Sequence, residues 1–343
     1  MWEPLGAAMR KLLIGLFIVV AIVAAAFLLS PWPSVFVIRT IFDSGAAEAS
    51  AKLERHLPRA IQTQTGQYDP ADADAFMDIH RPKRVLAGTP TIVWVHGGGF
   101  VSGRRSDLTN YTKILAGQGF VVVNIDYTIA PDAKYPVPVR QVNKALGYLS
   151  RNAQALGVDS DHIVLAGGSA GAQIAAQTAA VITNPQYAQA IGIEPSLSDG
   201  QIAGVLLFCG VYDITKMGEG GGLIGWFVKS TTWAYSGERD WRDAEGFETM
   251  NVAPNITANY PPAFVSAGNA DPLGPQSIGF ADSLEANGVA VDRLFFPGGY
   301  KPPLGHEYQF DLDIAAGREA LNRSVAWLRS LPSRGQPALP VRQ

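Results

Sequence analysis

This chain has a single cysteine, few charged residues and no excess of basic over acidic residues. Cys209 is the only cysteine among 343 residues, which excludes an intrachain disulfide, and no group of Cys and His has the spacing of a zinc site. Charged residues make up 17% of the chain, and 27 Lys and Arg stand against 30 Asp and Glu, so we expect no nucleic-acid partner. Hydrophobic residues reach 47%, which supports a large buried core and excludes a disordered chain.

A long apolar stretch without charge lies near the N-terminus. It runs from Leu12 to Leu29, directly after Arg10 and Lys11, and as a helix it would span about 27 Å, close to the thickness of a bilayer core. The positive-inside rule then predicts residues 1–11 in the cytoplasm, a transmembrane helix over 12–30 and the rest of the chain outside. Two alternatives stay open. Small residues at 24–26 could end a cleaved signal peptide of a secreted or periplasmic protein, and the run could be a buried helix.

The next segment, residues 31–86, carries no strong strand pattern. Trp32, Phe36 and Arg39 recur at helical spacing, so we expect helices beside the membrane or capping a pocket. A segment that only packs, with no role in substrate choice, is an equally open interpretation. At the other end of the chain, residues 332–343 are expected to form a loose tail.

Between these segments, residues 87–331 alternate between short apolar runs and amphipathic stretches. The alternation predicts a mostly parallel central sheet with helices on both faces. We expect strands at residues 91–95, 120–127, 162–166, 205–210, 263–267 and 291–297. We expect helices at residues 137–156, 170–182, 275–287 and 312–331.

A serine between glycines gives the strongest chemical signal. The motif Gly167–Gly171 places Ser169 between an apolar strand and a helical pattern, which is the context of a Gly-x-Ser-x-Gly nucleophile elbow. The strained turn holds the serine hydroxyl above the sheet, and the start of the helix adds amide donors. The pattern therefore predicts that Ser169 is a nucleophile.

A second glycine motif follows the first strand of the alternating region. His96 and three consecutive glycines, Gly97–Gly99, leave bare backbone N–H groups where a negatively charged oxygen can be held. A flexible turn rarely needs three glycines in a row. His96 itself is expected to orient this loop rather than to transfer protons.

The base and the acid follow from their order in the chain. In this type of triad the serine comes first, then Asp or Glu, then His, and His306 is the only histidine of five that follows Ser169. Asp271 lies between the two, directly after an expected strand, and is the favoured acid. Asp213 remains the rival, because it also lies just beyond the end of a strand.

These motifs, taken together, resemble the α/β-hydrolase carboxylesterases of the hormone-sensitive-lipase-like group, in order over residues 75–331. The segments that carry the resemblance are His96–Phe100, Asp126–Tyr127, Ala130–Pro136, Gly167–Gly171, Gly268–Leu273 and Gly305–His306. The resemblance implies an α/β-hydrolase catalytic domain over residues 87–331 and no cofactor or metal. It implies a triad of Ser169, Asp271 and His306, an oxyanion hole built from the amides of Gly98, Gly99 and Ala170, and supporting roles for His96, Gly97, Gly167, Gly168 and Gly171.

The chain departs from that group at two positions beside the nucleophile. Gly168 stands where the group commonly has an acidic residue, and Ala172 where it commonly has a further glycine. Gly168 resembles the elbows of related acetyl and feruloyl esterases, and Ala172 resembles those of aryl-formamide hydrolases. Residues 215–249, rich in glycine and aromatic residues, are expected to form a lid or pocket rim, with a plain surface loop as the alternative.

The expected function is hydrolysis of a small-molecule carboxylic ester by a serine enzyme tethered to membrane lipid by its N-terminal helix. The same residues would serve an amide, formamide or thioester hydrolase, because all these reactions pass through a tetrahedral oxyanion. A non-catalytic binding protein on the same scaffold is a third reading, although such a protein has no need of all three triad residues.

Overall fold

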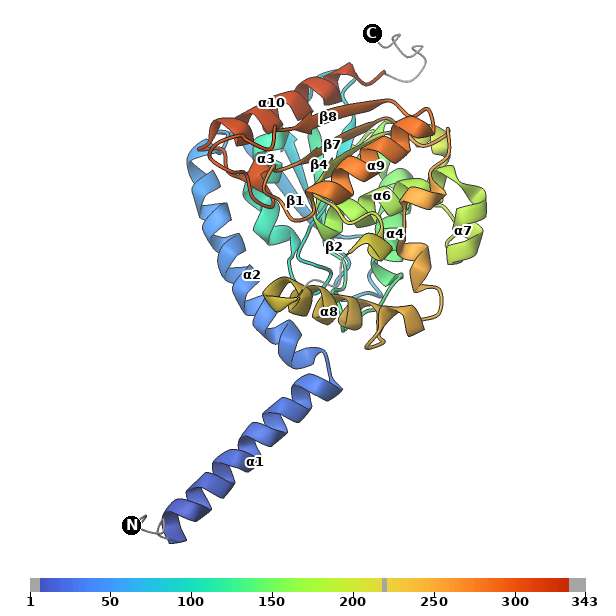
Figure 1. The fold of residues 1–343 in the computed structure, drawn as a ribbon. Coiled ribbons are helices and arrows are strands. Elements are labelled where there is room, and N and C mark those ends of the chain that lie inside the picture. The colour runs from blue at the N-terminus through green and yellow to red at the C-terminus, as the bar shows by residue number, and fades with distance from the viewer. Residues whose placement is uncertain (1–6, 218–220, 333–343) are drawn as a thin grey trace.

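A computed structural model describes residues 7–217 and 221–332 of the chain (Figure 1). Its centre is an eight-stranded sheet with the strand order β1-β2-β4-β3-β5-β6-β7-β8. The strands are β1 Ile61–Gln67, β2 Phe76–Pro82, β3 Thr91–Val95, β4 Val121–Ile125, β5 Ile163–Gly168, β6 Ile202–Phe208, β7 Ala263–Ala267 and β8 Val291–Phe295. β2 runs antiparallel to both β1 and β4, whereas all pairs from β4 to β8 are parallel. The carboxyl ends of six strands therefore meet at one edge.

Helices surround this sheet, and some of them pack on its two faces. They are α3 Thr109–Ala116, α4 Val137–Arg151, α5 Ala153–Leu156, α6 Ala170–Thr183, α7 Pro185–Ile191, α8 Gly222–Ser236, α9 Gly274–Ala286 and α10 Ala315–Ser330. Alternate strand residues point to opposite faces, so Val93 and Val95 pack with α4, α6 and α9, while Ile92 and Trp94 pack with α3 and α10. The two resulting cores hold the strand ends rigidly, which is the condition for a precise site.

The N-terminal helices lie outside the sheet. α1 Ala7–Leu29 projects away from the domain, and α2 Trp32–Leu53 runs along the side of the domain (Figure 1). Residues 9–29 form the one helix in the described part of the chain that is long and apolar enough to cross a membrane, with a mean hydropathy of 3.2 and no buried residues. The expected α/β-hydrolase architecture, with an apolar N-terminal helix, is thus confirmed.

The expectation for residues 31–86 is wrong in its second half. Residues 32–53 are helical, but residues 61–67 and 76–82 form β1 and β2, so the sheet begins well before residue 87. β1 is an exposed edge strand with few apolar residues. β2 is buried on both faces, with Met77 and Ile79 on one and Asp78 and His80 on the other. The two polar groups bond to Thr65 and Thr63 across the pair, at 2.6 and 2.9 Å. The apolar and polar alternation of β2 spans only residues 77–80, which is too short to stand out as a strand pattern.

The six strands expected from the sequence are all present, within five residues at each end. The helix expected over 137–156 is interrupted at Asn152, and the sequence reasoning missed α3, α7 and α8. α8 lies inside the 215–249 segment. The expected cytoplasmic end at residues 1–6 and the tail at 333–343 lie outside the described residues.

Candidate active site

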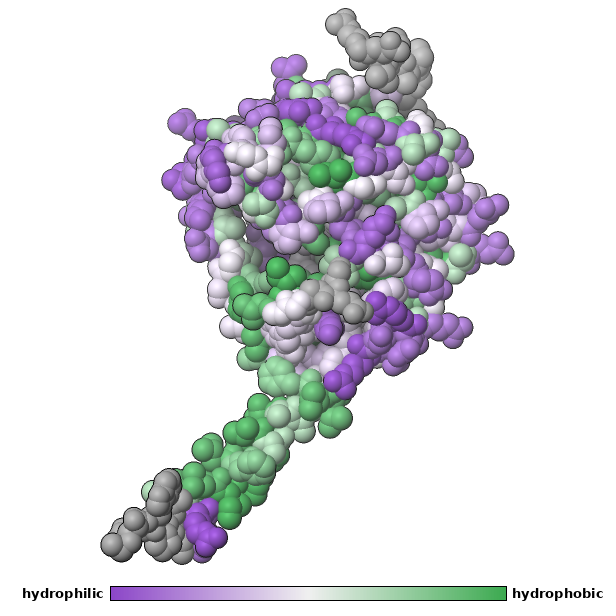
Figure 2. Space-filling model, in the orientation of Figure 1, coloured by the Kyte–Doolittle hydropathy of each residue, from purple (hydrophilic) through white to green (hydrophobic). Residues whose placement is uncertain are grey.

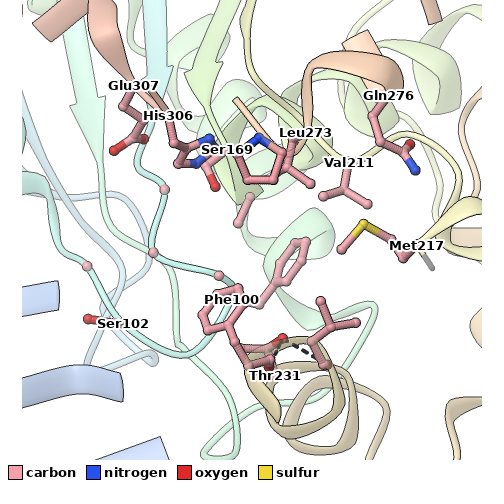
Figure 3. Close-up of a pocket in the computed structure, with 18 of the residues that line it drawn as sticks. Phe100, Ser102, Ser169, Val211, Met217, Thr231, Leu273, Gln276, His306 and Glu307 are labelled. Atoms are coloured by element: carbon pink, nitrogen blue, oxygen red, sulfur yellow. Dashed lines mark hydrogen bonds between the residues drawn. The ribbon is translucent and has the colours of Figure 1, made fainter. Parts of the chain in front are cut away.

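The turns after β3, β5, β6, β7 and β8 border one large cavity of about 1080 Å³. Ser169, Gly98, Gly99, Ala170 and His306 all line it, although they come from three separate turns. Figure 3 shows Ser169 and His306 on one side of this pocket, with Phe100 and Thr231 across from them. The parallel sheet thus brings together residues that are up to 208 positions apart in the chain.

Ser169 sits in a strained turn between β5 and α6. Its backbone has φ 54° and ψ −124°, outside the usual region for a side-chain-bearing residue, and its N–H donates to the carbonyl of Phe208 at 2.9 Å. The turn also passes close to the end of β3, because a Cβ on Gly171 would lie 2.1 Å from the carbonyl oxygen of Val95. Glycine is therefore required at 171, and the tight packing presents Ser169 to the pocket.

His306 and Asp271 form a hydrogen-bonded pair beside the serine. Nδ1 of His306 lies 3.1 and 3.0 Å from the two carboxylate oxygens of Asp271. The Asp271 side chain is fully enclosed, whereas the His306 side chain is 34% exposed toward the pocket. Asp271 also accepts a hydrogen bond from the backbone N–H of Leu273 at 2.8 Å, so a second contact, independent of the imidazole, orients its carboxylate.

The surroundings of His306 raise its pKa above the ordinary value. Burial disfavours the imidazolium, but Cys209 and the hydrogen-bonded carboxylate of Asp271 together outweigh that effect. Burial raises the pKa of the Cys209 thiol, and the neighbouring His306 opposes that shift. An enclosed carboxyl group hydrogen-bonded to an imidazole that borders the pocket is the arrangement expected of a general base.

Cys209 lies close to this pair, a neighbour that the sequence did not predict. Ligand atoms of Cys209, Asp271 and His306 are all within 4.8 Å of one another, and these three could be read as a metal site. However, Asp271 and His306 point their polar atoms at each other at hydrogen-bonding distance, which is the geometry of an acid–base pair.

The rival acid, Asp213, is engaged elsewhere. Its carboxylate accepts the backbone N–H of Thr215 at 3.0 Å and forms an ion pair with Lys216 at 3.2 Å. Among the described residues, the Asp213 carboxylate bonds only within its own turn, while the Asp213 backbone bonds to the side chain of Gln276 on α9. The structure therefore brings Asp271, and not Asp213, to His306.

The glycine loop after β3 lies across the pocket from this pair. Gly98 and Gly99 have φ values of 107° and 60°, in the region that favours glycine. The backbone N–H groups of Gly98, Gly99 and Ala170 donate no hydrogen bond to any other group in the part of the chain that the structure describes. Three amide donors are thus left free at the edge of the cavity.

His96 packs against Tyr127 and contacts the backbone of this loop. Its ring stacks on Tyr127 with centroids 4.1 Å apart, Nδ1 contacts the carbonyl oxygen of Gly97 at 2.8 Å, and the hydroxyl of Tyr127 donates to the His96 carbonyl at 3.1 Å. Burial lowers the pKa of His96, so its ring is neutral. The geometry agrees with an orienting role, as expected. His162 lies at the far end of β5 from Ser169 and is likewise buried.

Glu307 is the polar neighbour of the elbow that the sequence reasoning missed. It has a positive φ of 58°, and its Oε1 would lie 3.0 Å from a Cβ placed on either Gly97 or Gly168. Its carboxyl group therefore fills the space that these two glycines leave open. Burial raises the pKa of Glu307, with His306 opposing and Asp271 adding to the shift. The signal available in the sequence was Gly168 itself, since a glycine beside the nucleophile leaves room for a side chain from elsewhere.

The outer wall of the pocket comes from the segment at 215–249 and from α2. Met217, Phe227 and Thr231 line it, together with Ile41 and Phe42 of α2. The Phe42 and Phe227 rings pack with centroids 5.5 Å apart, which joins the two helices above the cavity. The described residues of this segment up to Thr232 therefore contribute to the pocket rim, one of the roles expected for residues 215–249.

A protein-family model with the description BD-FAE matches residues 77–284, more than half of the chain. The chain belongs to the BD-FAE family. The match contains Ser169 and Asp271, while His306 lies beyond its end. Membership of this family is therefore supported by the sheet and the nucleophile turn rather than by the last catalytic motif.

Solved esterase structures resemble the BD-FAE chain over most of its length. An esterase B from Lactobacillus rhamnosis, inhibited by a tributyrin phosphonate, is 22% identical with a TM-score of 0.75, covering 87% of this chain and 96% of its own. A hyperthermophilic esterase from Pyrobaculum calidifontis is 23% identical with a TM-score of 0.69, covering 96% and 99%. A thermophilic carboxylesterase from a metagenomic library, EstE1, is 23% identical with a TM-score of 0.69, covering 91% and 99%. The likeness predicted from the motifs is thus confirmed at the level of the fold.

Proposed function

We propose that this BD-FAE protein is a serine carboxylesterase held at a membrane by α1. The observation that carries the proposal is the hydrogen-bonded pair of His306 and Asp271, which borders the same cavity as Ser169 in its strained turn. A buried carboxylate, a base with a raised pKa and an exposed serine hydroxyl are what acyl transfer through a serine requires.

Acylation begins when the Ser169 hydroxyl attacks the ester carbonyl and His306 takes its proton through Nε2. Asp271 holds Nδ1–H, so it fixes the tautomer in which Nε2 is the accepting nitrogen and stabilises the imidazolium that forms. The negative charge that develops on the carbonyl oxygen is held by the free amides of Gly98, Gly99 and Ala170. Collapse of the tetrahedral intermediate expels the alcohol, which receives the proton from His306.

Deacylation repeats these steps with water as the nucleophile. His306 takes a proton from the water molecule, hydroxide attacks the acyl carbon, and the acid leaves with Ser169 restored as a hydroxyl. Every proton is returned within the cycle, so the residues named here account for it without a cofactor. The tributyrin phosphonate bound by the esterase from Lactobacillus rhamnosis lends support, because a phosphonate ester imitates this tetrahedral state.

The membrane part of the proposal rests on α1. The span of 21 residues at 9–29, apolar from Leu12 onward, is long enough for a bilayer core, and none of the side chains in its hydrophobic window is buried against the domain. Arg10 and Lys11 at its start support, by the positive-inside rule, an N-terminus in the cytoplasm and a hydrolase domain on the outer side.

A panel of p-nitrophenyl esters from acetyl to palmitoyl tests the reaction and its chain-length preference. The full-length protein in detergent is compared with Ser169→Ala, with a p-nitroanilide and a thioester as additional substrates. We expect ester hydrolysis that depends on Ser169. Faster turnover of the anilide or the thioester than of every ester would overturn the assignment to carboxylic esters.

A further inference from the structure

The exposed apolar side chains of the domain are concentrated around the entrance to the pocket. Beyond residue 30, eleven large hydrophobic side chains are exposed among the described residues, and six of them lie on α2 or at the start of α8. These six residues, called here the apolar rim, are Trp32, Phe36, Val37, Ile41, Leu223 and Ile224. Exposed clusters of this kind on a soluble domain mark a surface that binds an apolar partner.

The apolar rim is continuous with the active-site pocket. Ile41, Leu223 and Ile224 are 60%, 83% and 61% exposed, yet all three also line the cavity that contains Ser169. They therefore stand at its mouth. The rim is held together by the Phe42–Phe227 contact and by a hydrogen bond from Trp226 Nε1 to Ser34 Oγ at 3.2 Å.

The apolar rim is also continuous with the transmembrane candidate. Only Ser30 and Pro31 separate α1 from α2, and the backbone N–H of Ser30 still bonds to Ala26 at 3.1 Å. Figure 2 shows hydrophobic surface running from α1 onto the domain, as far as the edge of a hollow. A bilayer that contains α1 would therefore end within a few residues of Trp32, where indole side chains are favoured.

The position of α2 relative to the domain is fixed by polar contacts. Arg39 donates to the carbonyl oxygens of Val101 and Ala130 at 2.7 and 3.0 Å, and pairs with Asp132 at 3.2 Å. Both carbonyls belong to the loops that surround the glycine motif. Because α2 joins the membrane helix at one end and the pocket wall along its length, anchoring α1 also sets where the pocket mouth points.

From these relationships we infer that the pocket opens onto the outer surface of the membrane crossed by α1, with the apolar rim inserted into the lipid interface. The substrates are water-insoluble acyl esters that reside in that membrane, and their hydrocarbon chains enter between α2 and α8 without crossing bulk water. Insertion would remove from water apolar side chains that are otherwise exposed, which favours binding to the membrane. This inference rests on the proposed esterase activity and on α1 as the anchor.

Site-directed fluorescence tests the membrane contact directly. Cys209 is buried, so a cysteine introduced at the surface can be labelled selectively. Full-length Phe36→Cys carries a bimane label in phosphatidylcholine vesicles with and without doxyl-lipid quenchers, and Val85→Cys is the control, because Val85 is exposed but lies outside the rim. We expect quenching at 36 and little at 85. Equal quenching at both positions, or none at 36, would overturn the inference. Self-quenching that depends on protein concentration but not on lipid would instead assign the rim to a second copy of this chain.

A kinetic measurement tests the substrate class. Each variant is assayed with p-nitrophenyl acetate in solution and with a long-chain acyl ester embedded in the vesicles, and the ratio of the two rates is compared. Phe36→Asp should lower the ratio of embedded to soluble turnover by about tenfold, because a charge at the interface opposes insertion of the rim. Val85→Asp should leave the ratio within about twofold of the parent. An unchanged ratio in Phe36→Asp would overturn the inference without bearing on the proposed esterase activity. Failure of the parent protein to hydrolyse either substrate would instead refute the proposed function.

Discussion

Nδ1 of His306 faces both carboxylate oxygens of Asp271, at 3.0 and 3.1 Å, across the turns that follow β8 and β7. The contact commits one ring nitrogen to the acid and leaves Nε2 for proton transfer. Since Asp271 is fully enclosed and His306 is 34% exposed, the pair links the domain interior to the pocket. This relationship leads to the first two predictions.

Replacing the base or the nucleophile should abolish most of the activity without unfolding the protein. Ser169→Ala and His306→Ala should each lower turnover by roughly 10⁴- to 10⁶-fold, and the double variant should be little worse, because the two groups act as a unit. Steady-state kinetics on p-nitrophenyl butyrate measure this. Retention of more than about a tenth of wild-type activity in Ser169→Ala would refute the mechanism.

The two candidate acids can be separated by matched substitutions. Asp271→Asn should lower turnover by about 10⁴-fold, because the amide stabilises the wrong tautomer of His306. Asp213→Asn should have a small effect, since Asp213 contacts Thr215 and Lys216 rather than the base. Turnover of both variants is measured under the same conditions. A larger loss in Asp213→Asn would identify that residue as the acid.

The raised pKa of His306 predicts the acid limb of the pH profile. Burial alone would lower this pKa, but Cys209 and Asp271 raise it, so the neutral, active imidazole is lost as the pH falls through a value above 6.5. In Asp271→Asn the carboxylate is absent, and the midpoint of kcat/KM against pH should move to lower pH. An unmoved midpoint in the residual activity would show that Asp271 does not stabilise the charged base.

Glu307 predicts a stability effect with a definite sign. Burial raises its pKa above the unfolded value, so the folded state binds the proton more tightly and wild-type stability falls as the pH rises from the unfolded pKa, about 4.3, to the folded one. Glu307→Gln has no proton to lose at this position, so its stability should not fall over this pH range. Its Tm relative to wild type should therefore increase between pH 4 and pH 8, as measured by calorimetry. A relative Tm that stays constant with pH would contradict the buried, unpaired placement of the carboxyl.

Gly99 offers a test of the oxyanion hole. A Cβ at this position would lie 2.9 Å from Cζ of Phe227, on a backbone with φ of 60°, so Gly99→Ala should displace the loop. Loss of one donor lowers turnover by roughly 10²- to 10³-fold, with a weaker effect on substrate binding and reduced affinity for boronate analogues. Gly299→Ala is the control, since nothing lies within 4 Å of a Cβ there. Wild-type turnover in a folded Gly99→Ala protein would remove this amide from the hole.

Much of the fold could be predicted because apolar runs and glycine motifs are local signals. The strands at 91–95 and 263–267 match the sequence expectation at both ends, since each is buried on both faces and reads as a continuous apolar run. β2 escaped prediction because its alternation covers only residues 77–80, and because its buried Asp78 and His80 have their partners on another strand. Such pairing depends on tertiary contacts that no local window contains.

The candidate site was also predictable only in part. Ser169 and His306 could be predicted because a nucleophile elbow and the order of the triad residues are recognisable from residue type and position in the chain. The structure then places His306 beside Asp271. Glu307 and Cys209 could not be found in this manner, because their place beside the base depends on where the turns after β8 and β6 converge. The role of α8 was also open, since its contact with α2 joins segments nearly 200 residues apart.

The anchor can be tested separately from the chemistry. Full-length protein should sediment with membranes, resist extraction by carbonate and high salt, and be released by detergent, because burial of α1 does not depend on charge. Mass spectrometry of the mature N-terminus is the control. An N-terminus near Phe27 would show that the segment is a cleaved signal peptide.

Covalent trapping of the nucleophile tests the central claim most directly. The full-length protein is treated with a fluorophosphonate, whose phosphorus is attacked by an activated serine with loss of fluoride, and the modified peptide is sequenced by mass spectrometry. We predict one adduct per chain, located on Ser169, with concurrent loss of ester hydrolysis and no adduct in Ser169→Ala or His306→Ala. Esterase activity that survives complete labelling of Ser169, or an inactivating adduct on a different residue, would contradict Ser169 as the nucleophile.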